Sequence, residues 1–199
     1  MKNHETSLPE GYVNTLHINA TEPKTGAFFT VVSLVVMILV IALGLIPVFL
    51  GAIELTPKMF LESPLPILVY VVANIVYIVL HELAHGAAYK LLTNSKLTFG
   101  LSWSCAFCGV PNIYVYRRAA LISLLSPFVV FTIVFGIATA LLAFVSPVYY
   151  LVSLVILATH LGGCCGDLYV TLLFMTRLTK DTTLMRDTGP EQFFFEKQE

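Results

Sequence analysis

Charged side chains are scarce in this chain, and their scarcity excludes an ordinary soluble domain. Only 12% of the 199 residues are Asp, Glu, Lys or Arg, whereas a soluble domain carries about 25%. Hydrophobic residues make up 57% of the chain, and the mean hydropathy is +0.85. The length allows one domain, and the composition indicates that lipid is its solvent.

An excess of basic charge is also missing. The formal net charge is −1, which offers no attraction to a nucleic-acid backbone, so we expect no nucleic-acid partner. Residues 1–25 are polar and of mixed charge, and they lack the pattern of a cleavable signal peptide. We therefore expect the first apolar segment to remain as a membrane anchor.

Cysteine is too sparse, and the chain too long, for a disulfide scaffold of the kind found in short secreted proteins. The four cysteines occur as Cys105-x-x-Cys108 and Cys164-Cys165. A single Cys-x-x-Cys pair could be redox-active or could bind a structural zinc. Because no second such pair occurs, we interpret these cysteines as packing thiols.

Long apolar runs dominate what is present. A helix needs ~20 residues to cross the hydrocarbon core, and four segments are long enough. They predict an all-α multi-pass membrane protein with a membrane-embedded domain over 27–176 and polar tails over 1–26 and 177–199. The predicted spans are 27–53, 66–92, 119–145 and 148–176.

The basic residues predict the orientation of these spans. Of the 11 Lys and Arg residues, all but Lys58 lie in the tails or around the loop between the second and third spans. The positive-inside rule then places both termini and this loop in the cytoplasm. We expect an integral membrane protein, in the plasma membrane if the source is bacterial.

The loop between the second and third spans has its own pattern. Residues 96–103 alternate, and residues 112–116 are rich in β-branched and aromatic side chains, with Gly109 and Pro111 between them. This pattern predicts a short β-hairpin or a pair of extended strands beside the membrane.

The second span carries an ionisable cluster, His81-Glu82-Leu83-Ala84-His85. Histidines at positions i and i+4 share a helix face and can bind one Zn²⁺, with the intervening glutamate as general base. A charge at bilayer depth is costly, so such a cluster is a functional-site hypothesis by default. The alternative interpretation is a buried ion pair or a proton relay.

The fourth span carries Asp167 and His160. At ~1.5 Å per residue, Glu82 and Asp167 lie at similar depths from the cytoplasmic ends of their helices. A catalytic zinc takes three protein ligands and a water, so we assign His81, His85 and Asp167 as ligands.

Glu82 is then the predicted catalytic base. His160 is the second predicted catalytic residue, through a transition-state role. Three other roles of His160 remain open: it could be the third metal ligand, it could hydrogen-bond to a ligand, or it could make a purely structural hydrogen bond.

These residues resemble the site-2 protease group of intramembrane zinc metalloproteases. More closely, the chain is similar to a family of small membrane zincins with a His-Glu-x-x-His-Gly span, a later Gly-Asp pair and an Asp-Thr-Gly tail. The resemblance covers roughly residues 66 to 190. The matching segments are 81–86, Ser126-Pro127, Gly166-Asp167 and 187–189.

The resemblance implies the same ligands and the same base, and an extended 97–116 segment that pairs with substrate. The chain departs from the site-2 proteases in two places. Cys165-Gly166-Asp167-Leu168 replaces an Asn-Pro-Asp-Gly-like motif, and His160 stands where an upstream asparagine is expected. The Asp187-Thr188-Gly189 triplet occurs once, so we dismiss aspartic-protease chemistry.

The predicted function is that of a Zn²⁺-dependent metalloendopeptidase that hydrolyses a peptide bond in or near the membrane. Its expected partners are the lipid bilayer and a membrane protein or peptide substrate. Two alternatives use the same residues. One is an intramembrane metal-ion or proton transporter, and the other is a non-catalytic zincin-like binding protein.

Overall fold

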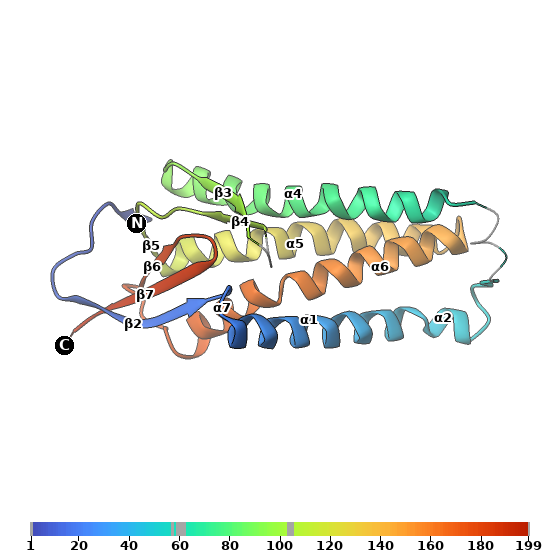
Figure 1. The fold of residues 1–199 in the computed structure, drawn as a ribbon, viewed down its shortest axis with the longest axis horizontal. Coiled ribbons are helices and arrows are strands. Elements are labelled where there is room, and N and C mark those ends of the chain that lie inside the picture. Colours follow the sequence, from blue (N-terminus) through green and yellow to red (C-terminus); the bar gives the residue numbers. More distant parts are fainter. Residues whose placement is uncertain (1, 57, 59–62, 103–105, 199) are drawn as a thin grey trace. The chain divides into compact units, whose positions relative to one another are not determined.

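The structure is a computed structural model that describes residues 2–56, 58, 63–102 and 106–198. Figure 1 shows its helices and strands. The helices are α1 (Pro23–Gly44), α2 (Ile46–Phe49), α4 (Leu65–Thr93), α5 (Arg117–Leu142), α6 (Pro147–Gly163) and α7 (Cys165–Thr176).

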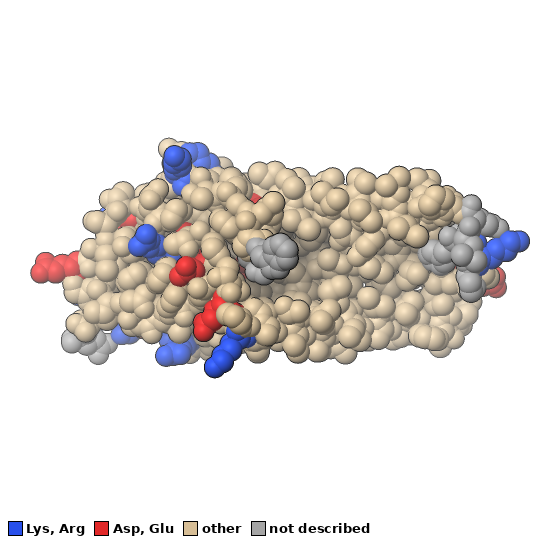
Figure 2. Space-filling model, in the orientation of Figure 1, with Lys and Arg blue, Asp and Glu red and all other residues tan. Residues whose placement is uncertain are grey.

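Three helical segments are long and apolar enough to cross a membrane: Pro23–Phe49, Leu65–Thr93 and Arg117–Val145. Large apolar side chains on them are exposed, among them Ile38 at 65% and Leu141 at 62%. A broad stretch of the face in Figure 2 carries no Lys, Arg, Asp or Glu side chains. Extended apolar surfaces of this kind are compatible with the predicted multi-pass membrane protein.

The fourth predicted span is two helices, α6 and α7, with a break at Cys164. The pair is long and apolar enough for a fourth span if it is counted as one. Gly162, Gly163 and Gly166 surround the break. Glycine is a poor helix former, which accounts for a break where length alone predicted one continuous helix.

The chain forms two compact units that interleave in sequence. Unit 1 comprises Met1–Phe29, Val79–Pro127 and Gly166–Glu199, and unit 2 comprises Thr30–Ile78 and Phe128–Cys165.

Unit 1 contains a five-stranded antiparallel sheet in the order β1-β5-β6-β7-β2. The all-α expectation is therefore corrected, because both predicted tails form strands. The tails look polar locally, yet their apolar residues pair between opposite ends of the chain, for example Leu16 with Phe194. The strands are β1 (His4–Glu5), β2 (Tyr12–Asn19), β5 (Tyr114–Tyr116), β6 (Leu184–Asp187) and β7 (Glu191–Lys197).

The loop between the second and third spans contains a hairpin, but its second strand differs from the expectation. The predicted extended segment at 112–116 contains β5, which pairs with β1 and β6 in the five-stranded sheet. Strands β3 (Thr98–Leu101) and β4 (Ala106–Gly109) pair antiparallel, with Phe99 opposite Cys108. Cys105 lies outside the described residues, and Cys108 is a buried free thiol. Burial raises the pKa of Cys108 to about 12, which opposes thiolate redox chemistry and agrees with a packing role.

One hydrophobic core joins the sheet of unit 1 to its helical segments. Tyr89 from α4, Leu124 from α5 and Phe174 from α7 are almost fully buried in it. Val115 from β5 and Phe194 from β7 are fully buried in the same cluster. The sheet therefore stabilises the parts of α4, α5 and α7 that belong to unit 1.

The Asp187-Thr188-Gly189 turn ties the C-terminal segment to this core. The Tyr89 hydroxyl donates to Asp187 Oδ2 over 2.7 Å, and the Gly189 N–H donates to Asp187 Oδ1 over 2.9 Å. The N–H of Val110 donates to the Asp187 carbonyl over 2.8 Å. Both carboxylate oxygens of Asp187 thus accept hydrogen bonds that stabilise the fold. The turn connects β6 to α4 and to the end of the hairpin.

Unit 2 is held together by close contacts between helices. The Ser33 hydroxyl donates to the Gly162 carbonyl over 2.8 Å, and a Cβ at Gly162 would lie 2.7 Å from Met37 Cγ. The hydroxyls of Thr139 and Ser153 are 2.8 Å apart. Small residues and hydroxyl pairs are the usual means of joining helices in lipid.

The buried carboxyl of Asp187 should make folding pH-dependent. Burial raises its pKa from 3.8 to about 6, although the hydrogen bonds from Tyr89 and Gly189 oppose the shift. The folded state therefore holds the proton more strongly than the unfolded chain, a difference worth roughly 3 kcal/mol. This stabilisation is complete below the unfolded pKa and is lost as the pH rises through the folded pKa.

We expect the melting temperature in detergent to fall as the pH rises from about 4 to 6. The Asp187→Asn variant should lose most of this pH slope. Asp181→Asn is the matched control, because Asp181 is exposed with 78% of its side-chain surface accessible. An unchanged slope in Asp187→Asn would show that Asp187 does not set the pH response.

Gly189 should not tolerate a side chain. Its φ is +100°, and an added Cβ would overlap the Phe107 ring. We expect Gly189→Ala to lower the free energy of unfolding by about 1–3 kcal/mol. Gly136→Ala is the control, since a Cβ there meets nothing within 4 Å and a helical alanine is favoured. Equal melting temperatures for the two variants would contradict this account of the turn.

Candidate metal centre

The predicted motif lies on α4, where i and i+4 positions share one helix face. His81 and His85 are both buried, with 9% and 7% of their surface exposed. Gly86 follows the motif directly. A Cβ there would lie 2.8 Å from the Phe99 ring and 3.3 Å from Cys108 Sγ. The glycine therefore allows the β3–β4 hairpin to pack against the motif helix.

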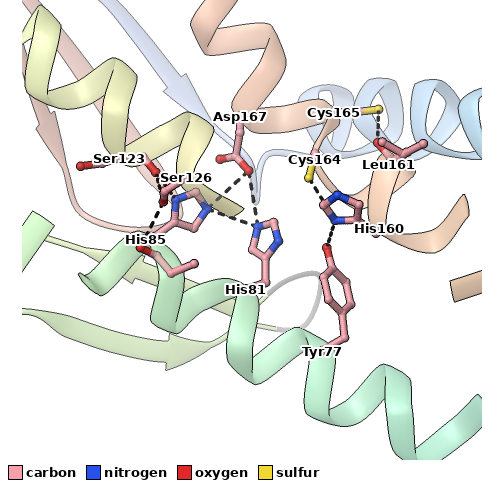
Figure 3. A network of polar contacts seen from close by, with 12 residues as sticks. Tyr77, His81, His85, Ser123, Ser126, His160, Leu161, Cys164, Cys165 and Asp167 are labelled. Atoms are coloured by element: carbon pink, nitrogen blue, oxygen red, sulfur yellow. Dashed lines mark hydrogen bonds and ion pairs between the residues drawn. The ribbon is translucent and has the colours of Figure 1, made fainter. Parts of the chain in front are cut away.

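Asp167 lies in the first turn of α7, where the helix dipole favours a carboxylate. Figure 3 shows its side chain directed at the two motif histidines. Asp167 Oδ2 is 3.5 Å from His81 Nε2 and 3.4 Å from His85 Nε2. The two Nε2 atoms are 3.2 Å apart. Three ligand-type atoms of unit 1 thus form a nearly equilateral triangle.

The dimensions of this triangle suit a zinc ion. Zinc bonds to His nitrogen and carboxylate oxygen are about 2.0–2.2 Å long, so tetrahedral ligands are separated by about 3.3–3.6 Å. The three atoms lie 3.2–3.5 Å apart, and His81, His85 and Asp167 form a group that could hold a metal ion. Two imidazoles and a carboxylate are also a donor set that zinc prefers.

The contacts of His85 favour its role as a ligand. His85 Nδ1 lies 2.8 Å from the carbonyl oxygen of Ser123. A carbonyl only accepts hydrogen bonds, so Nδ1 carries the proton and donates it. In the neutral imidazole, Nε2 then presents its lone pair toward His81 and Asp167. Metal-binding histidines are commonly oriented by such a bond from the other ring nitrogen.

Glu82 lies on α4 between the two histidines and is half-buried. Its carboxylate accepts a hydrogen bond from the backbone N–H of Cys108 and lies within electrostatic reach of His81, His85 and Asp167. The hairpin therefore supplies a fixed donor to the predicted base.

His160 belongs to unit 2 and is fully buried on α6. Its Nδ1 is 2.9 Å from the Tyr77 hydroxyl and its Nε2 is 3.0 Å from the Thr132 hydroxyl. The ring packs edge-on against Phe131 and Phe135. Both ring nitrogens are thus hydrogen-bonded to hydroxyls within unit 2, as Figure 3 shows for Tyr77.

The sequence indicated the ligand candidates and His160, but it did not indicate the groups that hydrogen-bond to them. Tyr77 and Thr132 carry no pattern that separates them from other polar residues of apolar helices. Ser123 acts through its backbone carbonyl, which no side-chain pattern can indicate. Ser126-Pro127 was a visible signal, and Ser126 Oγ lies within hydrogen-bond distance of the carbonyls of Ala84 and Ser123, to either of which it can donate its one proton.

The three ligand candidates should act together in metal binding. We expect one equivalent of Zn²⁺ or Co²⁺ to bind and to raise the melting temperature of the wild type, since ligands that bind only the folded state stabilise it. His85→Ala and Asp167→Ala should weaken binding at least about 100-fold. His17→Ala is the control, because His17 lies on β2 with 43% of its side chain accessible. A wild type with no metal-dependent shift would contradict the assignment.

The comparisons with known proteins agree with the zinc chemistry. Residues 74–180 match a family described as "Putative zincin peptidase". No curated protein and no solved structure matches the chain. The family match covers more than half of the chain and includes His81, Glu82, His85 and Asp167. It indicates a zinc metallopeptidase, and the chain belongs to this zincin peptidase family.

Proposed function

We propose that the chain is a membrane-embedded zinc metalloendopeptidase, related to site-2 proteases, that cleaves a peptide bond in or near the membrane. The observation that carries the proposal is the triangle of His81, His85 and Asp167 beside Glu82. Its atoms have the separations and the chemistry that a zinc ion requires. The apolar helices and the family membership support the setting and the reaction class.

In this proposal His81, His85 and Asp167 hold the zinc ion. When bound, zinc supplies Lewis acidity toward a substrate carbonyl and toward water. Glu82 accepts the proton of the attacking water and transfers it to the departing amine. The hydrogen bond from Cys108 N–H orients the Glu82 carboxylate for both transfers.

The hairpin is the proposed binding element for substrate. Strands β3 and β4 form a sheet of two strands, so each has one edge that the other strand does not use. An extended membrane protein segment or peptide can add to such an edge through main-chain hydrogen bonds. Cys108 lies on β4 and contacts Glu82, so a strand bound there would run beside the predicted base.

The proposed setting is a lipid bilayer, with both termini in the cytoplasm. The exposed apolar side chains of α1, α4 and α5 support contact with lipid. The concentration of Lys and Arg in the terminal segments and around residues 93–118 supports the orientation.

His160 stays a predicted catalytic residue. The hydroxyls of Tyr77 and Thr132 on its ring nitrogens support a histidine held in one orientation. A transition-state role would require one of these bonds to yield to the substrate. If a His160→Gln variant keeps both zinc binding and cleavage, His160 has a structural role and no catalytic one.

A glutamine at position 82 should separate metal binding from catalysis. We expect Glu82→Gln, purified in detergent, to retain zinc and to cleave transmembrane peptides about 10²–10⁴-fold more slowly than the wild type, because the general base is lost. Bound metal and cleavage of a peptide panel are measured on the same preparations. Glu10→Gln, an exposed glutamate of unit 1, is the matched control.

The alternatives give different outcomes in the same assays. A transporter would move Zn²⁺ or protons across vesicles and would cleave no peptide, and Glu82→Gln would change the transported ion. A zincin-like binding protein would hold zinc and capture peptides without hydrolysing them. Either result would overturn the peptidase proposal.

A further inference from the structure

Pro127 lies inside helix α5, where a proline is costly because it has no N–H for the helical ladder. In a regular helix the N–H of residue 127 would donate to the carbonyl of residue 123. Proline cannot make this bond, so the Ser123 carbonyl has no helical donor from that position.

The Ser123 carbonyl is used instead by two other donors. His85 Nδ1–H donates to it over 2.8 Å from α4, and the Ser126 hydroxyl lies 2.9 Å from it. A carbonyl has two acceptor sites, so these two donors can satisfy it. Residues 85, 123, 126 and 127 all belong to unit 1.

We propose that Pro127 is a positioning residue for the metal centre. Because Pro127 has no N–H, no helical donor from that position occupies the Ser123 carbonyl, and His85 Nδ1–H can donate to it. That bond holds the proton on Nδ1 and directs the Nε2 lone pair at the group formed with His81 and Asp167. The metal part of this inference rests on the proposed function, whereas the hydrogen bond can be tested without metal.

A second contact supports this role. The Ser126 hydroxyl lies 3.1 Å from the Ala84 carbonyl as well as 2.9 Å from the Ser123 carbonyl. Ala84 directly precedes His85 on α4. The turn from Ser123 to Pro127 therefore contacts both the backbone and the ring at the second histidine of the motif.

The competing explanation is that Pro127 only bends α5. The two explanations differ in what happens when the N–H is restored. If Pro127 is only a bend, Pro127→Ala changes stability and leaves the intrinsic zinc affinity alone. If it reserves the Ser123 carbonyl, the new N–H competes with His85, and zinc affinity falls although the helix gains a hydrogen bond.

The experiment compares Pro127→Ala with the wild type and with Pro147→Ala, on the full chain in detergent. Pro147→Ala makes the same change at the first residue of α6 in unit 2, where the proline displaces no helical hydrogen bond. We expect Pro127→Ala to bind Zn²⁺ about 10–100-fold more weakly, the usual effect of losing such a supporting bond. Its metal-free melting temperature should be equal or higher, and its Co²⁺ absorption spectrum should change. Pro147→Ala should match the wild type in affinity and spectrum.

A measurement on the metal-free wild type makes the test independent of zinc. In ¹⁵N NMR of histidine-labelled protein, His85 Nδ1 should carry a proton that exchanges slowly with water. Pro127→Ala, or Pro127→Gly if the alanine variant does not fold, should speed this exchange at least about tenfold. A wild-type Nδ1 without a proton would overturn the inference.

Wild-type zinc affinity in a folded Pro127→Ala or Pro127→Gly protein would overturn it as well. If the wild type binds no metal, the proposed function fails, and the Nδ1 exchange rates alone decide the inference. The two failures are therefore distinguishable.

Discussion

The structure of unit 1 depends on the close approach of three electron-rich atoms. Two imidazole nitrogens and a carboxylate oxygen lie within 3.2–3.5 Å of one another, and His81 and His85 are buried. In a medium of low dielectric constant such atoms repel unless a metal cation or a proton lies among them. The placement of Asp167 in the first turn of α7 and the Ser123 carbonyl on His85 Nδ1 both fit this requirement. One compensates negative charge through the helix dipole, and the other keeps a lone pair directed inward.

The sheet gives this cluster its rigidity, although it contributes no ligand. Tyr89 lies one helical turn after His85 and is 1% exposed, with its hydroxyl bonded to Asp187. The same Asp187 carbonyl accepts from Val110 at the end of the hairpin, and Cys108 of that hairpin donates to Glu82. The two ends of the chain thus form a sheet that connects the motif helix to the strand beside the base. A site whose geometry must be exact benefits from such buried supports.

The sequence predicts the local parts of this arrangement better than the contacts between residues far apart in the chain. The long apolar helices follow from apolar length, and the pairing of His81 with His85 follows from helical spacing, both of which are local. Asp167 could be assigned because Asp167 and Glu82 lie at similar distances from the predicted ends of their helices. The sheet could not be predicted, because β2 pairs with β7 across nearly the whole chain and each strand alone resembles a polar tail. The role of the Ser123 carbonyl could not be predicted either, since a backbone acceptor is not visible in the residue type. The Ser126-Pro127 pair was noticed in the sequence, but its contacts with α4 could not be predicted.

The arrangement of the four site residues favours hydrolysis over ion transport. Conduction requires ion sites that bind weakly enough to release, usually several along a path. Here His81, His85 and Asp167 converge on one point at zinc-ligand separations, which favours tight binding. Glu82 lies beside this group and is not part of it; it is half-buried, as Asp167 is, and has a backbone donor in Cys108. A base needs such a position, near the metal ligands and still reachable by water and substrate, whereas a fourth ligand for a transported ion would be better placed among the other three.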